Sequence, residues 1–453
     1  MASVFKSESL SPPPGQLRLE AWYRWLKQSL HRHGEAVLCR GTALALMANL
    51  VLRPGRFPPA ARVIGRAYMF HFWRPASAGQ WLDIVAAILL WPFAVITCGL
   101  WYTGKNGAAV AEQSGRSRIS QFGDQLRLST TSGLLPPWYY IFELYRPGEV
   151  RRARAYLTRG ETKHGAYTLL ANARGSSSPL GDKEAFAQFC AERQVNALPV
   201  LLSVHDGDLR WGAQATETFP ERDLFVKPVH GRGGRGAERW DYAGNGAYAN
   251  CENGRATAAQ LIEHLRRLSQ WQPYLVQERA QNHPAMRDLT NGALSTIRMI
   301  SCLDEREQPE LIGAVLRMAI GENVTVDNVH AGAIAASLDL AEGRLGQATY
   351  MGIDATRPWI DRHPDSGGRI TDRIVPMWGE VCDLVRRAHC AFEDWVVIGW
   401  DVAITAEGAL LVEGNSGPDI DLIQRPLRTA LGDSRLGELL AYHLARSEPA
   451  WRL

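Results

Sequence analysis

The stretch Val397 to Asn415, VIGWDVAITAEGALLVEGN, contains two apolar runs of strand length separated by Ala406-Glu407-Gly408. This pattern predicts a β-hairpin. A three-residue turn centred on the glutamate places Asp401 directly opposite Glu413, where paired Cβ atoms lie about 5 Å apart. A two-residue turn at Glu407-Gly408 would instead place Asp401 opposite the glycine that follows Glu413, so the pairing depends on the register.

The paired carboxylates of this hairpin predict a bound cation. Two facing carboxylates on a buried strand pair repel each other unless a positive group lies between them. Asn415 shares the face of Glu413, because strand side chains repeat every second residue. Mg²⁺ fits this set, since it uses one or two carboxylates and leaves its other positions to water and phosphate. The alternative is that Asp401 and Glu413 are solvated strand residues and that Glu-Gly-Asn only leads into a loop.

The composition is that of a globular protein with two or three domains and a sizeable core. The 453 residues carry a net charge of +3 from 50 basic and 47 acidic side chains, which gives no reason to expect a nucleic-acid partner. The seven cysteines form no CxxC pair and no zinc spacing, so we expect free thiols in a reducing compartment. No secretory signal is evident, and we expect a cytoplasmic protein.

The N-terminal third is apolar and helical in pattern. Leu17 to Leu30 has the spacing of an amphipathic helix. Ile84 to Tyr102 has no charged residue over nineteen positions, which is long enough to span a bilayer. Basic residues lie on both sides of it, so orientation is not set, and Pro92 is compatible with a kinked or interfacial helix. Membrane contact, peripheral to the inner face of the membrane, and a buried core helix are the two interpretations.

A glycine-rich turn follows a predicted strand in the second half of the chain. The strand covers Leu224 to Val229, and the turn HGRGGRG covers residues 230–236. Glycines in such a turn let backbone N–H groups approach a phosphate, and Lys227 would project beside them as a point charge. Taken alone, the same pattern also fits a mobile hairpin loop.

Two arginines lie within otherwise apolar predicted strands, Arg298 in Leu294–Leu303 and Arg317 in Glu310–Ile320. A charged side chain in such a place is usually paired or faces a ligand. A structural salt bridge is the competing interpretation.

Several motifs taken together resemble the ATP-grasp superfamily. They are DKEAFAQFC from Asp182, FVKPVHGRGGRG from Phe225, LVQER from Leu275 and DVAITAEGALLVEGN from Asp401, in the order shown by that superfamily. From about residue 121 to 424 the chain resembles more narrowly the sugar-transfer-associated ATP-grasp group, which is related to α-L-glutamate ligases. LPPWYYIFELY, STIRMIS, HPDSGGRI and IGWDVAITAEGALLVEGN carry this narrower likeness.

This resemblance implies an α+β fold in which two subdomains grip ATP, preceded by a mainly helical N-terminal region. We expect a helical region over residues 1–104, a helical and aromatic region with a linker over 105–180, and the catalytic domain over 181–445. Most ATP-grasp ligases begin with a Rossmann-like substrate domain. The apolar N-terminal region here departs from that pattern, so the substrate cannot be carried over.

The resemblance also implies roles for individual residues. Lys183 and Lys227 would contact the phosphates, and Gly233, Gly234 and Gly236 would form a mobile lid over them. Gln277 and Glu278 would lie at the adenine hinge. The Mg²⁺ ligands would be Asp401, Glu413 and Asn415.

The implied reaction is Mg-ATP-dependent joining of a carboxylate to an amine through an acyl phosphate, in which a glycan or a peptide is modified. Arg298 and Arg317 would hold the carboxylate and the later oxyanion, with Lys227 beside the transferred phosphoryl group. His363 could assist proton transfer, although a lone loop histidine is more often structural. An ATP-grasp kinase and a non-catalytic nucleotide-binding protein at a membrane assembly are the alternatives.

Overall fold

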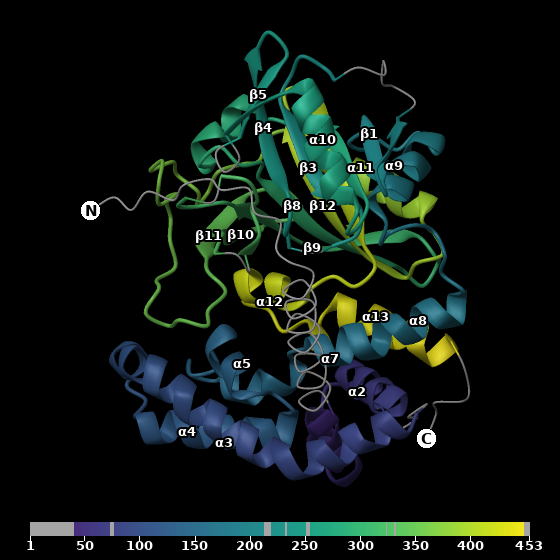
Figure 1. Cartoon of the computed structure of the whole chain (residues 1–453). Coiled ribbons are helices and arrows are strands. Elements are labelled where there is room, and N and C mark those ends of the chain that lie inside the picture. The colour runs from purple at the N-terminus through teal and green to yellow at the C-terminus, as the bar shows by residue number, and fades with distance from the viewer. Residues whose placement is uncertain are drawn as a thin grey trace, which may run out of the picture.

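The computed structural model describes residues 40–72, 77–212, 219–231, 233–250, 254–322, 324–329 and 332–447. The helix expected at Leu17–Leu30 lies outside them. The described chain forms a helical N-terminal region and two antiparallel sheets, each with its own covering helix (Figure 1).

The helical region begins with a helix at Arg40–Leu52 and continues through short and long helices. They are η1 (Pro54–Arg56), α2 (Pro59–Phe72), α3 (Ala78–Ser114), α4 (Arg118–Ser132), α5 (Pro136–Ile141), α6 (Glu149–Arg152), η2 (Ala153–Ala155), α7 (Arg159–Glu161), the π-helical turn η3 (Thr162–Ala166) and α8 (Tyr167–Arg174).

Helix α3 runs through the boundary expected between residues 104 and 105. The helix continues past Pro92 and ends only where Gly115 adopts a left-handed backbone with φ 72°. An interior proline removes one backbone hydrogen bond and typically costs about 3 kcal/mol, and the helix continues through Pro92 in spite of this cost. The apolar stretch and the residues that follow it to Ser114 therefore form one helix, and the expected boundary falls inside α3.

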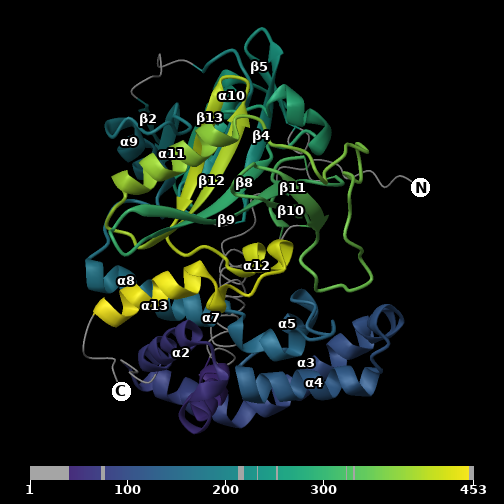
Figure 2. The ribbon, with the colours of Figure 1, turned by 180° about the vertical axis from the view of Figure 1, so that it is seen from behind.

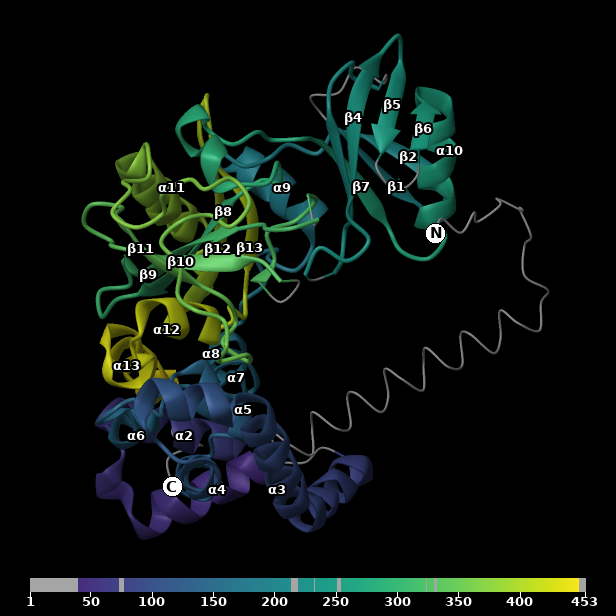
Figure 3. The same ribbon diagram turned by 90° about the vertical axis from the view of Figure 1, so that its left-hand side faces the viewer.

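The first sheet has seven strands in the order β2-β1-β7-β3-β4-β5-β6. The strands are β1 (Leu202–His205), β2 (Asp208–Trp211), β3 (Leu224–Pro228), β4 (Glu238–Gly244), β5 (Ala247–Asn250), β6 (Gly254–Thr257) and β7 (Tyr274–Glu278). Helix α10 (Ala258–Ser269) covers one face, where its Leu261 and Leu265 pack on Val226 and Val276 of the sheet. This lobe stands apart from the rest of the molecule in Figure 3.

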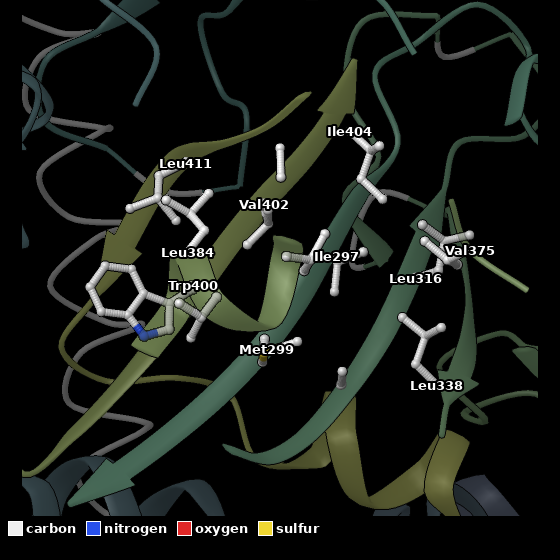
Figure 4. Close-up of a cluster of buried hydrophobic side chains, with 14 of the residues drawn as sticks. Ile297, Met299, Leu316, Leu338, Val375, Leu384, Trp400, Val402, Ile404 and Leu411 are labelled. Carbon is white, nitrogen blue, oxygen red and sulfur yellow. The ribbon is translucent and has the colours of Figure 1, made fainter. Parts of the chain in front are cut away.

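The second sheet has six strands in the order β11-β10-β9-β8-β12-β13. The strands are β8 (Thr296–Leu303), β9 (Pro309–Met318), β10 (Ile334–Leu338), β11 (Leu345–Thr349), β12 (Val397–Thr405) and β13 (Gly408–Asn415). Trp400, Met299 and Leu316 point from its strands into one apolar core, together with Leu384 of α11 (Trp378–Ala391) (Figure 4). Helix α9 (Lys183–Glu192) and the 3-10 turn η4 (Pro284–Leu289) pack against the same core.

The opposite face of the six-stranded sheet shares a core with the helical region. Ile300 and Val315 of the sheet are fully buried in one cluster with Ile64 of α2 and Leu440 of α13 (Arg435–Ser447). Helices α12 (Asp421–Leu427) and α13 lie between the sheet and the N-terminal helices (Figure 2), with the short turn η6 (Leu431–Asp433) between them. The helical region is thus packed on the sheet and shares a core with it.

The elements predicted around the site are confirmed with small shifts at their ends. The hairpin, the strands at β3, β7, β8 and β9 and the helix capped by Asp182 all form. The Asp182 carboxylate accepts hydrogen bonds from the backbone N–H groups of Glu184 and Ala185, as a helix N-cap should.

Candidate functional site

The β12–β13 hairpin pairs Asp401 with Glu413, but through a turn and a bulge that differ from the expected turn. The turn has two residues, because Thr405 pairs with Gly408, so the three-residue turn expected here is wrong. A β-bulge then inserts Val412 as an extra residue on β13 and shifts the register by one. The bulge restores the pairing that the shorter turn would otherwise have removed.

The nearest cation to Asp401 is a guanidinium. Arg298 lies opposite Asp401 on the neighbouring strand β8 and donates from Nε to Oδ1 at 2.5 Å and from Nη2 to Oδ2 at 3.0 Å. Arg317 Nη2 reaches Oδ2 at 3.1 Å. Burial alone would raise the pKa of Asp401, but the two guanidinium groups hold it below its ordinary value. All three residues are at most 8% exposed, so this is a buried charge cluster.

Arg317 has a second carboxylate, that of Asp327, at 3.4 Å. Asp327 also accepts hydrogen bonds from the backbone N–H and hydroxyl of Thr296, at 2.7 and 2.6 Å. Thr296 in turn accepts from Arg317 Nε at 3.1 Å. Asp327 therefore fixes the guanidinium of Arg317 next to Asp401. It lies in an irregular segment, and its sequence gave no signal beyond one acidic residue in a loop.

Two lysines lie near Glu413. Lys183 Nζ is 4.0 Å from Glu413 Oε1 and donates to the carbonyl of Gly231 at 3.0 Å. Lys227, on β3, is 7% exposed, and burial lowers its pKa to about 8; Glu413 opposes this effect and Lys183 adds to it. The structure thus brings together both lysines and the acidic hairpin from separate elements.

The glycine-rich turn closes onto the segment after β9. Gly233, Gly234 and Gly236 all have φ of 72° or 73°, a left-handed conformation that favours glycine. The side-chain amide of Asn328 donates to the carbonyl of Gly233 at 3.0 Å. A Cβ on Gly234 would lie 2.7 Å from the side chain of Val326. Only glycine at this position therefore lets the turn fit against the segment after β9.

The two expected hinge residues point to opposite faces of β7. Gln277 pairs with Phe225, two residues from Lys227, and its buried side chain shares the face of that lysine. Its Nε2 donates to the carbonyl of Leu198 at 2.9 Å, and its Oε1 has no partner among the described residues. Glu278 faces the other way and forms an ion pair with Arg222 at 2.7 Å. On the face of β7 that Lys227 shares, Glu278 can contact an adenine base only through its backbone.

The residues expected to hold Mg²⁺ share one face and fit a hard cation. Glu413 and Asn415 are two positions apart on β13, and Asp401 pairs with Glu413, so the three side chains offer oxygen donors of the kind that a hard cation prefers. The described residues contain no cluster of three or more His, Cys, Asp or Glu side chains. A site with two carboxylates and an amide is what Mg²⁺ uses when phosphate completes its coordination.

A second charge cluster adjoins the site and was not predicted. Asp419 lies beyond the Glu-Gly-Asn motif and forms ion pairs with Lys163 and, at 3.4 Å, with Arg159. Arg159 also reaches Asp421 through Nη2 at 2.6 Å. Asp419 is close enough to Arg298 for each to affect the pKa of the other. Lys163 lies in the π-helical turn η3, a local distortion that the sequence pattern did not show.

His363 is a structural residue in this fold. Its ring is 1% exposed, and Nε2 lies 3.0 Å from the carbonyl of Ala319. The Nδ1 atom accepts from the backbone N–H groups of Asp365 and Ser366 at 3.4 Å. Both ring nitrogens are thus occupied by backbone, which favours the structural interpretation over proton transfer.

Comparison with solved structures finds amino-acid ligases at low similarity. D-alanine–D-alanine ligase from Bacillus anthracis is 12% identical, with 59% of this chain and 67% of that chain covered and a TM-score of 0.32. D-alanyl-alanine synthetase A from Vibrio cholerae is 10% identical, with 59% and 65% covered and a TM-score of 0.34. L-amino acid ligase from Bacillus licheniformis is 10% identical, with 57% of this chain and 50% of that chain covered and a TM-score of 0.32. The match thus spans between 50% and 67% of these proteins' lengths. No curated protein matches the sequence.

The decisive comparison is with a family model. The model described as sugar-transfer associated ATP-grasp matches residues 163–434, which is more than half of the chain. The matched segment begins at Lys163 and includes both sheets, the cluster around Asp401, and all of the second charge cluster except Arg159. The α+β architecture with a helical N-terminal region agrees with the expected fold. The chain belongs to the sugar-transfer associated ATP-grasp family.

Proposed function

We propose that this protein is an ATP- and Mg²⁺-dependent ligase that joins a carboxylate to an amine. The observation that carries this proposal is the gathering of Lys183, Lys227 and Glu413 beside the buried cluster of Arg298, Arg317 and Asp401. Phosphoryl transfer depends mainly on positioning and on neutralising spread negative charge. The lysines near Glu413 and the arginines bonded to Asp401 supply such a site.

The two lysines would bind the phosphates of ATP. Lys227 is protonated below about pH 8 and is held at the site by its buried strand. Lys183 sits at the first position of α9, where the positive end of the helix dipole also favours an anion. The glycine turn over residues 233–236 would cover the phosphates and exclude water, which protects a reactive acyl phosphate from hydrolysis.

The proposed reaction has two steps. An oxygen of the substrate carboxylate attacks the γ-phosphorus, the bond to the β-phosphate oxygen breaks, and ADP leaves. The amine nitrogen then attacks the acyl carbon, phosphate leaves with the bridging oxygen, and the amine loses a proton. Arg298 and Arg317 would hold the carboxylate and then the oxyanion, where one lost donor typically costs about 3 kcal/mol of transition-state stabilisation.

Mg²⁺ would be held by Glu413, Asn415 and one oxygen of Asp401. When bound, it would neutralise charge on the β- and γ-phosphates. Glu413 is the freest of these ligands, since it is 25% exposed and its nearest cation is 4.0 Å away. Asp401 already bonds two arginines, so it contributes one shared oxygen at most.

The family description, sugar-transfer associated ATP-grasp, supports a sugar-containing acceptor. A peptide acceptor and a cytoplasmic location, where ATP is available, are further parts of the proposal. Contact of residues 84–102 with a membrane, one of the two interpretations of that stretch, would place the reaction at the inner face. Related ligases in solved structures join amino acids, which supports small carboxylates and amines as the first substrates to test.

The proposal is tested by ¹⁸O transfer. Purified protein is incubated with Mg-ATP, amines and carboxylates labelled with ¹⁸O, and the phosphate released is analysed by mass. A ligase moves one ¹⁸O atom from the carboxylate to inorganic phosphate. A kinase instead yields ADP and a stable phosphorylated product, and that result would replace the ligase proposal.

Two glutamate variants provide the matched control. Glu413→Gln should abolish turnover, whereas Glu342→Gln, in a surface ion pair with Arg344, should keep wild-type activity. Full activity in Glu413→Gln would refute the metal assignment.

A further inference from the structure

The exposed face of α3 is apolar over most of its first six turns. Its large side chains recur every three or four residues on one side of the helix and are between 44% and 70% exposed: Leu82, Val85, Leu89, Phe93, Ile96 and Leu100. Trp81 and Trp101 lie near the two ends of this row and are 54% and 71% exposed. A contiguous apolar surface of this size marks an interaction site, and tryptophan at both ends is typical of a membrane interface.

The other face of α3 is held along its whole length by the folded protein. Near the start, Ile84 is buried with Leu46 and Tyr68, which belong to the preceding helices. Further on, a Cβ on Gly99 would lie 2.9 Å from Phe122 of α4, and Thr103 accepts from the side-chain amide of Gln125 at 2.7 Å.

These contacts decide the orientation of the helix. If α3 crossed a bilayer, α4 would enter the hydrocarbon with the buried side chain of Gln125 and the ion pairs of Asp124. Charged groups are strongly disfavoured at that depth. The helix can therefore lie along a membrane surface, but it cannot span the membrane without unfolding the region around it.

The net positive charge of the helical region indicates that the membrane surface it would bind is anionic. Residues 40–160 contain 15 Lys and Arg but only five Asp and Glu, a formal net charge of +10 in a chain whose total is +3. Exposed Val51 and Leu52 are followed directly by Arg53 and Arg56. These two arginines and Arg127 lie close enough to Arg154 to help lower its pKa, after burial. Apolar side chains beside clustered arginines match the headgroup region of an anionic leaflet.

We propose that the apolar face of α3 binds an anionic membrane leaflet, with the helix lying parallel to the membrane plane. Figures 1 and 3 place α3 at the end of the molecule opposite the seven-stranded sheet, so such a contact leaves the lobe with β1–β7 in water. This goes beyond the ligase proposal, and it does not depend on the reaction catalysed.

The test measures binding of the full chain to vesicles of phosphatidylcholine with and without about one third phosphatidylserine. We expect co-sedimentation with the anionic vesicles and a bound fraction at least about tenfold lower for the double variant Leu89→Glu/Phe93→Glu. Trp271→Glu is the matched control, because Trp271 is 74% exposed after α10 and far from α3. Unchanged thermal unfolding of each variant shows that the fold survives.

A second measurement separates lying on the membrane from spanning it. Gly79 and Gly104 flank the apolar row, and neither would place a Cβ in a close contact. With protein added outside the vesicles, a membrane-impermeant maleimide should modify both Gly79→Cys and Gly104→Cys beyond the wild-type background. Protection of one site in bound protein would show a spanning helix and refute the parallel orientation.

Three further results would refute the proposal. They are no binding to anionic vesicles, binding that the double glutamate variant retains, and a stable dimer that this variant converts to a monomer without any lipid binding. The last result would assign the face to a second copy of the chain. Failure of any of these tests would leave ATP turnover by the same preparations unaffected, so it is distinguishable from failure of the ligase proposal.

Discussion

Replacing Asp401 by Asn should destabilise the protein strongly although the side chain keeps its shape. The carboxylate is bonded to Arg298 at 2.5 and 3.0 Å and to Arg317 at 3.1 Å, and all three groups are buried. Removing one partner of a buried ion pair typically costs about 3–5 kcal/mol, because a charge is left uncompensated. Arg317 keeps Asp327 at 3.4 Å, and Asp419 also attracts Arg298. We therefore expect a loss at the lower end, about 3 kcal/mol.

The assay is urea unfolding followed by tryptophan fluorescence, with Glu413→Gln as the comparison. Glu413 is partly exposed and 4.0 Å from Lys183, so its neutralisation should change stability by less than about 1 kcal/mol. The double variant Arg298→Met/Asp401→Asn should be less destabilised than the sum of the two single variants, with a coupling of about 2 kcal/mol. If Asp401→Asn unfolds within about 1 kcal/mol of wild type, the buried cluster does not carry the energy assigned to it.

Three other perturbations test separate parts of the site. The pKa of Lys227 is lowered from 10.5 to about 8, so the side chain loses its charge as pH rises through 8; affinity for a Mg-ATP analogue, measured by calorimetry, should fall up to about tenfold per pH unit above that value, and not in Lys227→Met. Gly234→Ala should raise KM for ATP more than Gly246→Ala, since both residues have positive φ but only the first would press a Cβ on Val326. Equal effects of the two variants on KM would argue against closure of this turn on the segment after β9. His363→Ala should lower the melting temperature but leave the pH profile of kcat unchanged, whereas a shifted profile would indicate a role in proton transfer.

The hairpin illustrates what a strand pattern can and cannot predict. Alternation placed Asp401 and Glu413 on one face, but their pairing depends on the sum of the turn length and one bulge at Val412. Nothing in the apolar run Ala409 to Val412 distinguishes a bulged residue from a regular one. The expected pairing was therefore correct although the expected turn was wrong.

The cation between the carboxylates illustrates a second limit. Charge repulsion required a positive group near Asp401, and the sequence analysis expected a metal ion there; a salt bridge was considered for Arg298, but without a partner. Only the order of strands in the sheet, with β8 next to β12, brings Arg298 opposite Asp401. Strand order is a long-range property that periodicity does not contain. The same is true of Lys163 and Asp419, which are distant in sequence and meet through the packing of η3 beside the hairpin.

The packing of the helical region has a consequence for how the protein would work at a membrane. Ile64 of α2 and Leu157 share a buried core with Ile300 of β8, and β8 also carries Arg298. A surface fixed through α3 is thus joined to the acidic and basic cluster by close-packed side chains, and close-packed interiors transmit displacement with little slack. The seven-stranded lobe, which carries Lys227 and the glycine turn, lies at the opposite end (Figure 3). If the α3 face rests on lipid, opening and closing over ATP falls to that lobe, while the arginines that would hold the acceptor stay at a fixed height above the membrane.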